Sequence, residues 1–344
     1  MIHHSPRAPL SLLLRRPSAA MDEALSLAPS RFHFSRDALH AWFAGHGTVW
    51  FPSFHCGMEV RAAVDAGCTP RFYRVRDDLR IDEADLAARL AREPGVVVVI
   101  HYFGFPQPAV RRIDAPLLED CSHAFLSRLE GQPLGTFGDA ATFSTYKTLG
   151  TVDGGALRGS CGAGFQATPR PRQTIALDAH LATWKRRRRD RAEADGDILR
   201  RRFDDRVRTA RARIFEGPWQ YGRGMSRLSL ALTRRIDPRP VIERRRANYQ
   251  RLAQLLGVDR HLDDGVVPLF LPYFVDDRSV DRTGALVRLQ ANGIEPFIFG
   301  MFFHPAMNES EFPEARRLRE NLLCLPIHHD LRDRDLLRIA EVLR

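Results

Sequence analysis

Two lysines stand out in a chain that otherwise uses arginine for its positive charges. Of the 52 lysine and arginine residues, only Lys147 and Lys185 are lysines. Lys185 begins a run of charged residues, whereas Lys147 lies among small and apolar residues in TFSTYKTLGTVDGG. A desolvated lysine can lose its proton and form an imine with a carbonyl group, which an arginine cannot do. Lys147 is therefore the first candidate for a catalytic residue, with a surviving surface charge as the alternative.

Two further segments carry side chains that could act with such a lysine. An apolar run ends in Glu119 and Asp120 within LLEDCSHAF, and Ser35 precedes a helical pattern that we expect to start at Arg36. Taken alone, each has an ordinary explanation as a turn residue or as a helix cap. Together with the lysine they supply what pyridoxal 5'-phosphate (PLP) requires. A lysine forms the Schiff base, a carboxylate pairs with the pyridine nitrogen, and a helix N-terminus receives the phosphate.

In these features the chain resembles the sugar-nucleotide aminotransferases of the DegT/StrS type, a branch of the fold-type I PLP enzymes. That family has an acidic pair followed by small residues and a His or Gln, then GDAA, FS and a lysine, with a glycine pair seven residues after the lysine. The matching residues here are Glu119-Asp120-Cys121-Ser122-His123, Gly138-Asp139-Ala140-Ala141, Phe143-Ser144, Lys147 and Gly154-Gly155. With further similarities in PSFHCG, HYFG, RRANY and CLPIHHDL, the resemblance runs from about residue 30 to the C-terminus.

The resemblance implies catalytic roles for three of these residues. Lys147 would carry the cofactor and shuttle a proton. Asp120 would keep the pyridine nitrogen protonated, because a nearby carboxylate favours the charged form, and Glu119 is the alternative for this role. His123 would hydrogen-bond the 3-oxygen of the ring, unless it is simply a satisfied polar residue under the sheet.

The remaining cofactor contacts implied by the resemblance are to the phosphate and to the face of the ring. Ser144 and the backbone amides near Ser35 and Arg36 would bind the phosphate at a helix start. His55 lies in the segment from which the family stacks a side chain on the ring. The family commonly has an aromatic residue one position later, where this chain has Cys56.

The chain also departs from the family pattern at three points. Only two residues separate Ser144 from Lys147, which makes that loop tighter than usual. The family supplies an asparagine from the neighbouring subunit in a segment like YNYRMS, and the matching YGRGMS lacks it, so Arg223 is the candidate replacement. A related dehydratase branch has histidine in place of the lysine, and Lys147 argues against that branch.

The resemblance implies a PLP-dependent aminotransferase that moves an amino group from an amino acid, with glutamate as the expected donor, to a keto-sugar nucleotide. One alternative is a PLP enzyme acting on a non-sugar ketone, and another is a PLP-binding regulatory homologue, since fold does not decide function. The working unit is expected to be a homodimer with active sites at the subunit boundary.

Strands that alternate with helices must position these residues. Apolar, β-rich runs are expected at 49–51, 71–75, 96–100, 116–118, 140–143 and 155–157, with helices at 57–65 and 83–91 between them. The run VVVVI has no alternation, so both faces of that strand should be buried, as in a parallel sheet covered by helices. We therefore predict an α/β fold of the fold-type I PLP-transferase kind, with a large, mostly parallel α/β/α sheet domain and a smaller C-terminal α+β domain.

The organisation along the chain follows from the same patterns. Residues 1–25 form a loose segment or an accessory helix, 26–235 the PLP-binding domain and 236–344 the small domain. Within the large domain, 179–235 is expected to be helical and rich in arginine. In the small domain we expect a helix after Pro240 that ends at Gly257, β-like runs at 267–274 and 297–299, and a closing helix at 333–343.

Composition excludes several other classes of protein. The net charge is +10, but 13 basic against 6 acidic residues lie between Lys185 and Arg213, so the basic character is local. Because acidic residues are mixed into that run, a solvated helix face is expected, and nucleic-acid binding is a distant alternative. No apolar stretch is long enough to span a membrane. The 5 scattered cysteines, without CxxC spacing, indicate a reduced, cytoplasmic protein with no metal site.

Overall fold

The fold is taken from a computed structural model of the chain. It describes residues 2–162, 219–258, 261–275 and 282–344, and a few isolated residues between 163 and 218. The basic run 185–213, and most of the helical segment predicted at 179–235, lie outside the described residues. None of the described helices has the length and apolar character needed to cross a bilayer.

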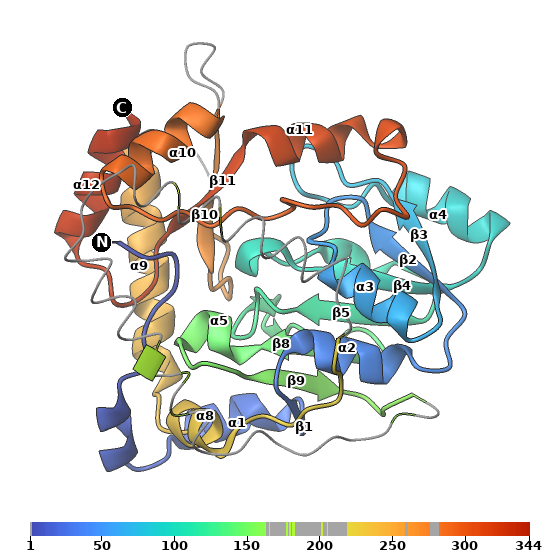
Figure 1. The fold of residues 1–344 in the computed structure, drawn as a ribbon, viewed down its shortest axis with the longest axis horizontal. Helices are drawn as coiled ribbons and strands as arrows, with labels where there is room; N and C mark the ends of the chain where they lie inside the picture. Colours follow the sequence, from blue (N-terminus) through green and yellow to red (C-terminus); the bar gives the residue numbers. More distant parts are fainter. Residues whose placement is uncertain are drawn as a thin grey trace.

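Seven strands form the central sheet (Figure 1), in the order β1-β9-β8-β5-β4-β2-β3. β2, β3, β4, β5 and β8 are parallel, whereas β9 is antiparallel to both β8 and β1. The bounds are Ser30–Phe32 (β1), Thr48–Pro52 (β2), Thr69–Tyr73 (β3), Val96–Ile100 (β4), Leu117–Cys121 (β5), Ala140–Ser144 (β8) and Gly155–Arg158 (β9). The predicted α/β class with a mostly parallel sheet is confirmed.

Short helices connect and cover these strands. They are α1 (Ala19–Ser26), α2 (Ser35–Phe43), α3 (Met58–Asp65), α4 (Glu83–Arg92) and α5 (Thr145–Leu149). The 3-10 turns are η1 (Leu10–Leu14), η2 (Tyr102–Gly104) and η3 (Pro108–Arg111), and β6 (Arg128–Leu129) pairs with β7 (Gln132–Pro133) in a small hairpin. α2 and α3 pack against each other, and α2 lies against β8 and β9. Every residue of β4 is buried, as its unbroken apolar run predicted.

The start of α2 differs from the sequence prediction by one residue. Ser35 is the first helical residue rather than the cap, and Phe34 occupies the capping position. The cap is made instead by Asp37, whose carboxylate accepts a hydrogen bond from the Phe34 amide at 3.1 Å. The Ser35 hydroxyl is therefore available for a hydrogen bond with another residue.

The C-terminal part of the chain packs beside the sheet (Figure 1). Its elements are α8 (Arg227–Thr233), α9 (Pro238–Leu256), β10 (Phe270–Phe274), α10 (Arg282–Ala291), η4 (Glu309–Glu311), α11 (Pro313–Asn321), β11 (Leu322–Pro326) and α12 (Asp333–Leu343). α9 starts before the predicted point because a helix tolerates proline in its first turn, and it ends at Gly257 as predicted. The predicted run at 297–299 makes only one bridge, between Phe297 and Cys324, so the expectation of a strand there is wrong.

The first residues of the chain join this C-terminal part. Ile2 forms a parallel bridge with Ile294, in which the Ile2 amide donates to the Gly293 carbonyl at 2.7 Å and the Glu295 amide donates to the Ile2 carbonyl at 2.8 Å. Farther along, Ser18 caps α1. Residues 1–25 thus contain most of α1, preceded by a segment that pairs with the C-terminal part.

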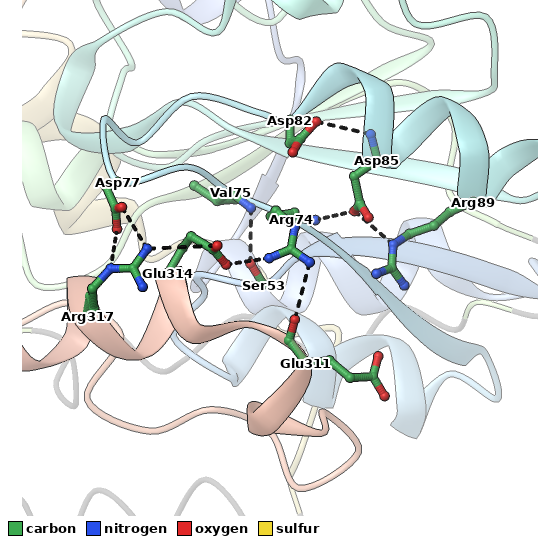
Figure 2. A network of polar contacts seen from close by, with 10 residues as sticks. All are labelled: Ser53, Arg74, Val75, Asp77, Asp82, Asp85, Arg89, Glu311, Glu314 and Arg317. Atoms are coloured by element: carbon green, nitrogen blue, oxygen red, sulfur yellow. Dashed lines mark hydrogen bonds and ion pairs between the residues drawn. The ribbon is translucent and has the colours of Figure 1, made fainter.

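Ion pairs tie the outer edge of the sheet to α11, as Figure 2 shows. Arg74, just after β3, binds Glu314 at 2.6 Å, and Arg317 binds Asp77 at 2.7 Å. Because these side chains are partly exposed, each ion pair adds little to the stability of the fold. Their effect is mainly geometric, because they hold the element that follows residues 295–302, which line the cavity described next.

Candidate active site

A cavity of about 470 Å³ lies where the carboxyl ends of the parallel strands meet the C-terminal part of the chain. Its size is within the range of small-molecule sites, and ligands of open α/β sheets bind at this end of the strands. Most of its wall is apolar, and a few charged or polar side chains converge on it. Of the residues singled out in the sequence, the structure brings together Ser35, Arg36, Asp120, His123 and Lys147.

Strand alternation assigns different tasks to the two acids of β5. Glu119 is fully buried and accepts hydrogen bonds from His101 at 3.0 Å and from the amides of Gly135, Phe137 and Gly138 at 2.7–2.9 Å. Burial would raise the pKa of Glu119, but these hydrogen bonds outweigh it and hold the pKa below its usual value. Glu119 is thus a structural anion on the face opposite the cavity.

Asp120, one residue later, points into the cavity. It is 7% exposed, and its Oδ1 accepts a hydrogen bond from the Ser122 amide at 2.8 Å. Because successive side chains of a strand face opposite sides, Glu119 and Asp120 cannot both reach the cavity. Only Asp120 lines it, which favours Asp120 over the alternative that the sequence left open.

Lys147 enters the cavity from α5, which follows β8 directly. Its side chain is half-buried, and no hydrogen bond or ion pair connects it to any other residue that the structure describes. A lysine held in a mostly apolar cavity without a carboxylate partner keeps its amine accessible to a ligand. This arrangement supports the reactive role expected from the sequence.

His123 and Ser122 present buried polar atoms to the same space. His123 is 4% exposed and stacks on Phe103 with the ring centroids 5.5 Å apart. Burial lowers the pKa of His123 well below its usual value, with a smaller effect from the charge of Lys147, so the imidazole is neutral. His123 Nδ1 and Ser122 Oγ have no hydrogen-bond partner among the described residues. Buried polar atoms of this kind normally have partners, so both await a ligand or a water.

The N-terminus of α2 lines part of the cavity. The Ser35 hydroxyl, freed from capping, accepts a hydrogen bond at 2.9 Å from Ser144 Oγ, which is fully buried and does not itself line the cavity. Arg36 lines the cavity and stacks over Phe34 and Trp219, with its guanidinium 4.6 and 4.1 Å from their ring centroids. A helix N-terminus beside an arginine is suited to a phosphate.

The structure places His55 outside the cavity lining. His55 is fully buried, its Nδ1 lies 3.1 Å from the Ser53 carbonyl, and its Nε2 accepts a hydrogen bond from the His304 amide at 3.0 Å. Burial lowers its pKa to about 3, so the ring is neutral. Both ring nitrogens are therefore committed to holding the loop after β2 against residue 304, and the geometry gives no support to stacking by His55.

Cys56, the next residue, does line the cavity, together with Glu59, which the sequence analysis missed. The Glu59 carboxylate accepts hydrogen bonds from the Cys56 amide at 2.9 Å and from its thiol at 2.7 Å. Burial raises the pKa of both groups. In the sequence, Glu59 is indistinguishable from any acidic residue in the first turn of a helix, so no local signal could have found it.

The glycine pair before and within β9 permits two close approaches. A Cβ on Gly155 would collide with the backbone of Phe34 and Ser35, and a Cβ on Gly154 with Thr145 Oγ1. Gly154 also has φ +148, which favours glycine. The glycine motif thus brings the start of α2 and the start of α5 against the same strand, next to the cavity.

One group of buried side chains has the composition of a metal site. Donor atoms of His101, Glu119 and Cys121 lie within 4.8 Å of one another. However, His101 Nδ1 accepts a hydrogen bond from the Gln107 amide, and Nε2 faces Glu119, whose oxygens are already bonded. The hydrogen bonds account for this cluster without an ion.

Known proteins are similar to this chain in sequence and in fold. The model of the DegT/DnrJ/EryC1/StrS aminotransferase family matches residues 38–159. This part of the chain is similar to that family. The matched range contains Asp120, His123 and Lys147, and the aminotransferase class predicted from the sequence motifs is confirmed.

Individual members of the family are similar to the chain over most of its length. UDP-N-acetyl-3-dehydro-α-D-glucosamine 3-aminotransferase of Acidithiobacillus ferrooxidans is 25% identical over 339 residues, which cover 89% of this chain and 80% of the relative. Two solved structures share the fold. DesI with its TDP-sugar product has a TM-score of 0.67 at 20% identity and covers 100% of this chain and 91% of its own. A sugar aminotransferase of Streptococcus pneumoniae in its PMP form has a TM-score of 0.70 at 15% identity, covering 100% and 98%.

Proposed function

We propose that this chain is a PLP-dependent aminotransferase that transfers an amino group from an amino acid, with glutamate as the expected donor, to a keto-sugar nucleotide. The match to the aminotransferase family model supports the amino transfer. The name of the Acidithiobacillus relative and the TDP-sugar product bound to DesI support the class of acceptor. The observation that carries the proposal is the cavity in which Lys147 and Asp120 meet the N-terminus of α2.

The residues of the cavity fit PLP in their polar chemistry. The buried Nδ1 of His123 and Oγ of Ser122 lack partners among the described residues, as expected for groups that face a ligand with oxygen atoms. The amides at the start of α2, with Arg36, would hold the phosphate, and Ser144 would fix the Ser35 hydroxyl that lies there. Asp120 would pair with the pyridine nitrogen. Bound PLP would supply the electron sink that stabilises negative charge at the reacting carbon of the substrate.

Lys147 would carry out the proton transfers that the protein itself contributes. Its Nζ would hold the cofactor between reactions and, once released by an amino donor, take the proton from the donor's α-carbon and return one to the acceptor's carbon. The apolar wall excludes water from this proton, and the neutral His123 orients the ligand without adding a competing charge.

A homodimer is part of the same proposal. Gly224 bridges Phe32 at the edge of the sheet, and the Arg223 carbonyl accepts a hydrogen bond from the His33 amide at 2.7 Å. This places the exposed Arg223 side chain, which contacts Gln220, next to the phosphate end of the cavity. An arginine on the surface at that point is suited to contact an anion in the site of a partner copy.

Two alternative functions would also use PLP but differ in the acceptor or in the role of the protein. The acceptor could be a non-sugar ketone, or PLP binding could serve regulation. Nucleic-acid binding through residues 185–213 rests on a segment outside the described residues, and no observation favours it. Amino transfer to a sugar nucleotide has the support of the named relatives.

The test begins with the cofactor and ends with the acceptor. Purified protein incubated with PLP should turn yellow, and borohydride reduction followed by peptide mapping should place the label on Lys147. Because Lys185 is the only other lysine, the map has two possible sites. In a separate, unreduced sample, the protein that has taken up an isotope-labelled amino group from an amino acid should transfer this nitrogen to one member of a panel of keto-sugar nucleotides. Label on Lys185 only, or no transfer to any sugar with transfer to simple ketones, would reject the proposal.

A further inference from the structure

The wall of the cavity that comes from the C-terminal part of the chain carries a polar cluster. Residues 295–302 form this wall, and apart from Glu295 they are apolar or glycine. His4, from the first residues of the chain, lines the cavity beside Glu295. Neither residue was predicted from the sequence, because they are almost three hundred positions apart.

The backbone pairing of Ile2 with Ile294 brings the two residues together. It sets His3 and His4 alongside Glu295, whose Oε2 lies 2.9 Å from His3 Nδ1 and 3.5 Å from His4 Nδ1. The Glu295 side chain is 11% exposed and that of His4 30%. His3 therefore anchors the carboxylate, whereas His4 is the more exposed partner at the cavity surface.

This cluster lies one aromatic ring away from the reacting centre. The Phe297 ring is 5.8 Å from the His4 ring and 6.2 Å from the His123 ring, centroid to centroid. Phe299 packs on His123 at 5.2 Å and continues the apolar wall. A ligand that reacts beside His123 would extend across Phe297 toward Glu295 and His4.

We propose that Glu295 and His4 form the subsite that recognises the hydroxyl-bearing ring of the acceptor, an assignment that rests on the proposed aminotransferase function. A carboxylate only accepts hydrogen bonds and has several lone-pair positions, so it is suited to hydroxyl groups. The buried Nδ1 of His4 has no well-formed hydrogen bond among the described residues, so His4 can also meet a polar group of the ligand.

Charge argues for a neutral ring at this end and against an anion. Phosphate groups are favoured at Arg36 and the start of α2, whereas Glu295 would repel them. The side-chain carboxylate of a glutamate donor would be repelled as well. Glu295 should therefore affect the two half-reactions differently. It favours binding of the sugar acceptor and does not favour binding of the keto acid that forms from the donor.

The test compares two acceptors on the same enzyme. The pyridoxamine form of the full chain is mixed with the keto-sugar nucleotide that the wild type aminates best, and in parallel with 2-oxoglutarate. Glu295→Gln should lower kcat/KM for the sugar nucleotide by about tenfold to a hundredfold, as expected for a lost hydrogen bond to a charged group. The same variant should leave kcat/KM for 2-oxoglutarate unchanged or raised. His4→Ala should show the same selectivity to a smaller extent.

Controls separate recognition from folding. Glu320→Gln and His261→Ala remove an exposed carboxylate and an exposed imidazole elsewhere, and both acceptors should react as with the wild type. An equal loss for both acceptors in Glu295→Gln, or unchanged sugar kinetics, would overturn the subsite while an active wild type leaves the proposed function standing. A wild type that aminates no keto-sugar nucleotide would instead overturn the proposed function.

Discussion

Replacing Gly155 by alanine tests how tightly β9 is packed against the phosphate end of the cavity. The new Cβ would lie 2.6 Å from the Ser35 nitrogen and closer still to the Phe34 carbonyl group, all of them backbone atoms. Ordinary contact starts at 3.4 Å, so the Ser35 nitrogen would have to retreat by about 0.8 Å, and the Phe34 carbonyl group by more. No side-chain rotation can relieve the contact, because backbone meets backbone.

The cost falls on both stability and cofactor affinity. Overpacking of this kind costs about 1–3 kcal/mol. The amides that would hold the phosphate move with the helix start, and a hydrogen bond to a charged group is worth about 1.5–3 kcal/mol. Loss of half of one such bond costs about 0.75–1.5 kcal/mol, and ~1.4 kcal/mol corresponds to a tenfold change in affinity. We expect Gly155→Ala to unfold at a lower temperature and to bind PLP about threefold to tenfold more weakly.

The assay is an absorbance titration of the unloaded protein with PLP, beside thermal unfolding. Gly47→Ala is the matched control, because a Cβ there meets nothing within 4 Å. Both measurements on the control should match the wild type. A Gly155→Ala protein with wild-type unfolding temperature and wild-type PLP affinity would refute the close-approach reasoning.

Four further predictions follow from the site and the sequence. Lys147→Arg should stay folded but lose the yellow colour and amino transfer, as read by absorbance and activity, because a guanidinium cannot form the imine. Asp120→Asn should bind PLP yet lose most of its kcat, because an amide does not stabilise a protonated ring nitrogen; near-normal turnover would point to Glu119 instead. Glu119→Gln should lower the unfolding temperature at pH 7. Because the fold lowers the pKa of Glu119, its contribution is present above about pH 4.3 and fades as the pH falls through the folded pKa, so the difference from wild type should shrink in acid. Light scattering should find a dimer, and Arg223→Ala should weaken PLP binding; a fully active monomer would contradict the shared site.

Local patterns in the sequence were sufficient for most of the sheet domain. Six of the seven strands overlap predicted runs, because parallel strands covered on both faces are short and continuously apolar. β1 was missed, since Ser30–Phe32 is a three-residue edge strand with no apolar run. The prediction of a strand at 297–299 was wrong, because the apolar residues of this run line a cavity wall and do not form a strand of a sheet.

The site residues could be predicted where they lie at the ends of adjacent strands, and not elsewhere. Asp120 lies near the end of β5 and Lys147 follows β8, and the ends of these adjacent parallel strands must meet at one edge of the sheet. His55 and Cys56 are adjacent too, but the turn after β2 directs one side chain into the protein and the other into the cavity, which only the structure decides. His4 and Glu295 depend on a pairing between the two ends of the chain, for which the sequence has no local signal.

Arg245 connects the RRANY segment to the short helix that carries Lys147. This residue of α9 is 1% exposed, and its guanidinium donates to the carbonyls of Leu269 at 3.0 Å, Pro268 at 3.3 Å and Thr148 at 3.0 Å. Thr148 lies in the last turn of α5, where helix carbonyls lack intrahelical partners and a positive charge is favourable. Arg245 therefore caps the short helix that carries Lys147 and joins it to the segment that leads into β10. A helix of one turn is not stable alone, so the position of the lysine depends on this buried contact from the C-terminal part of the chain.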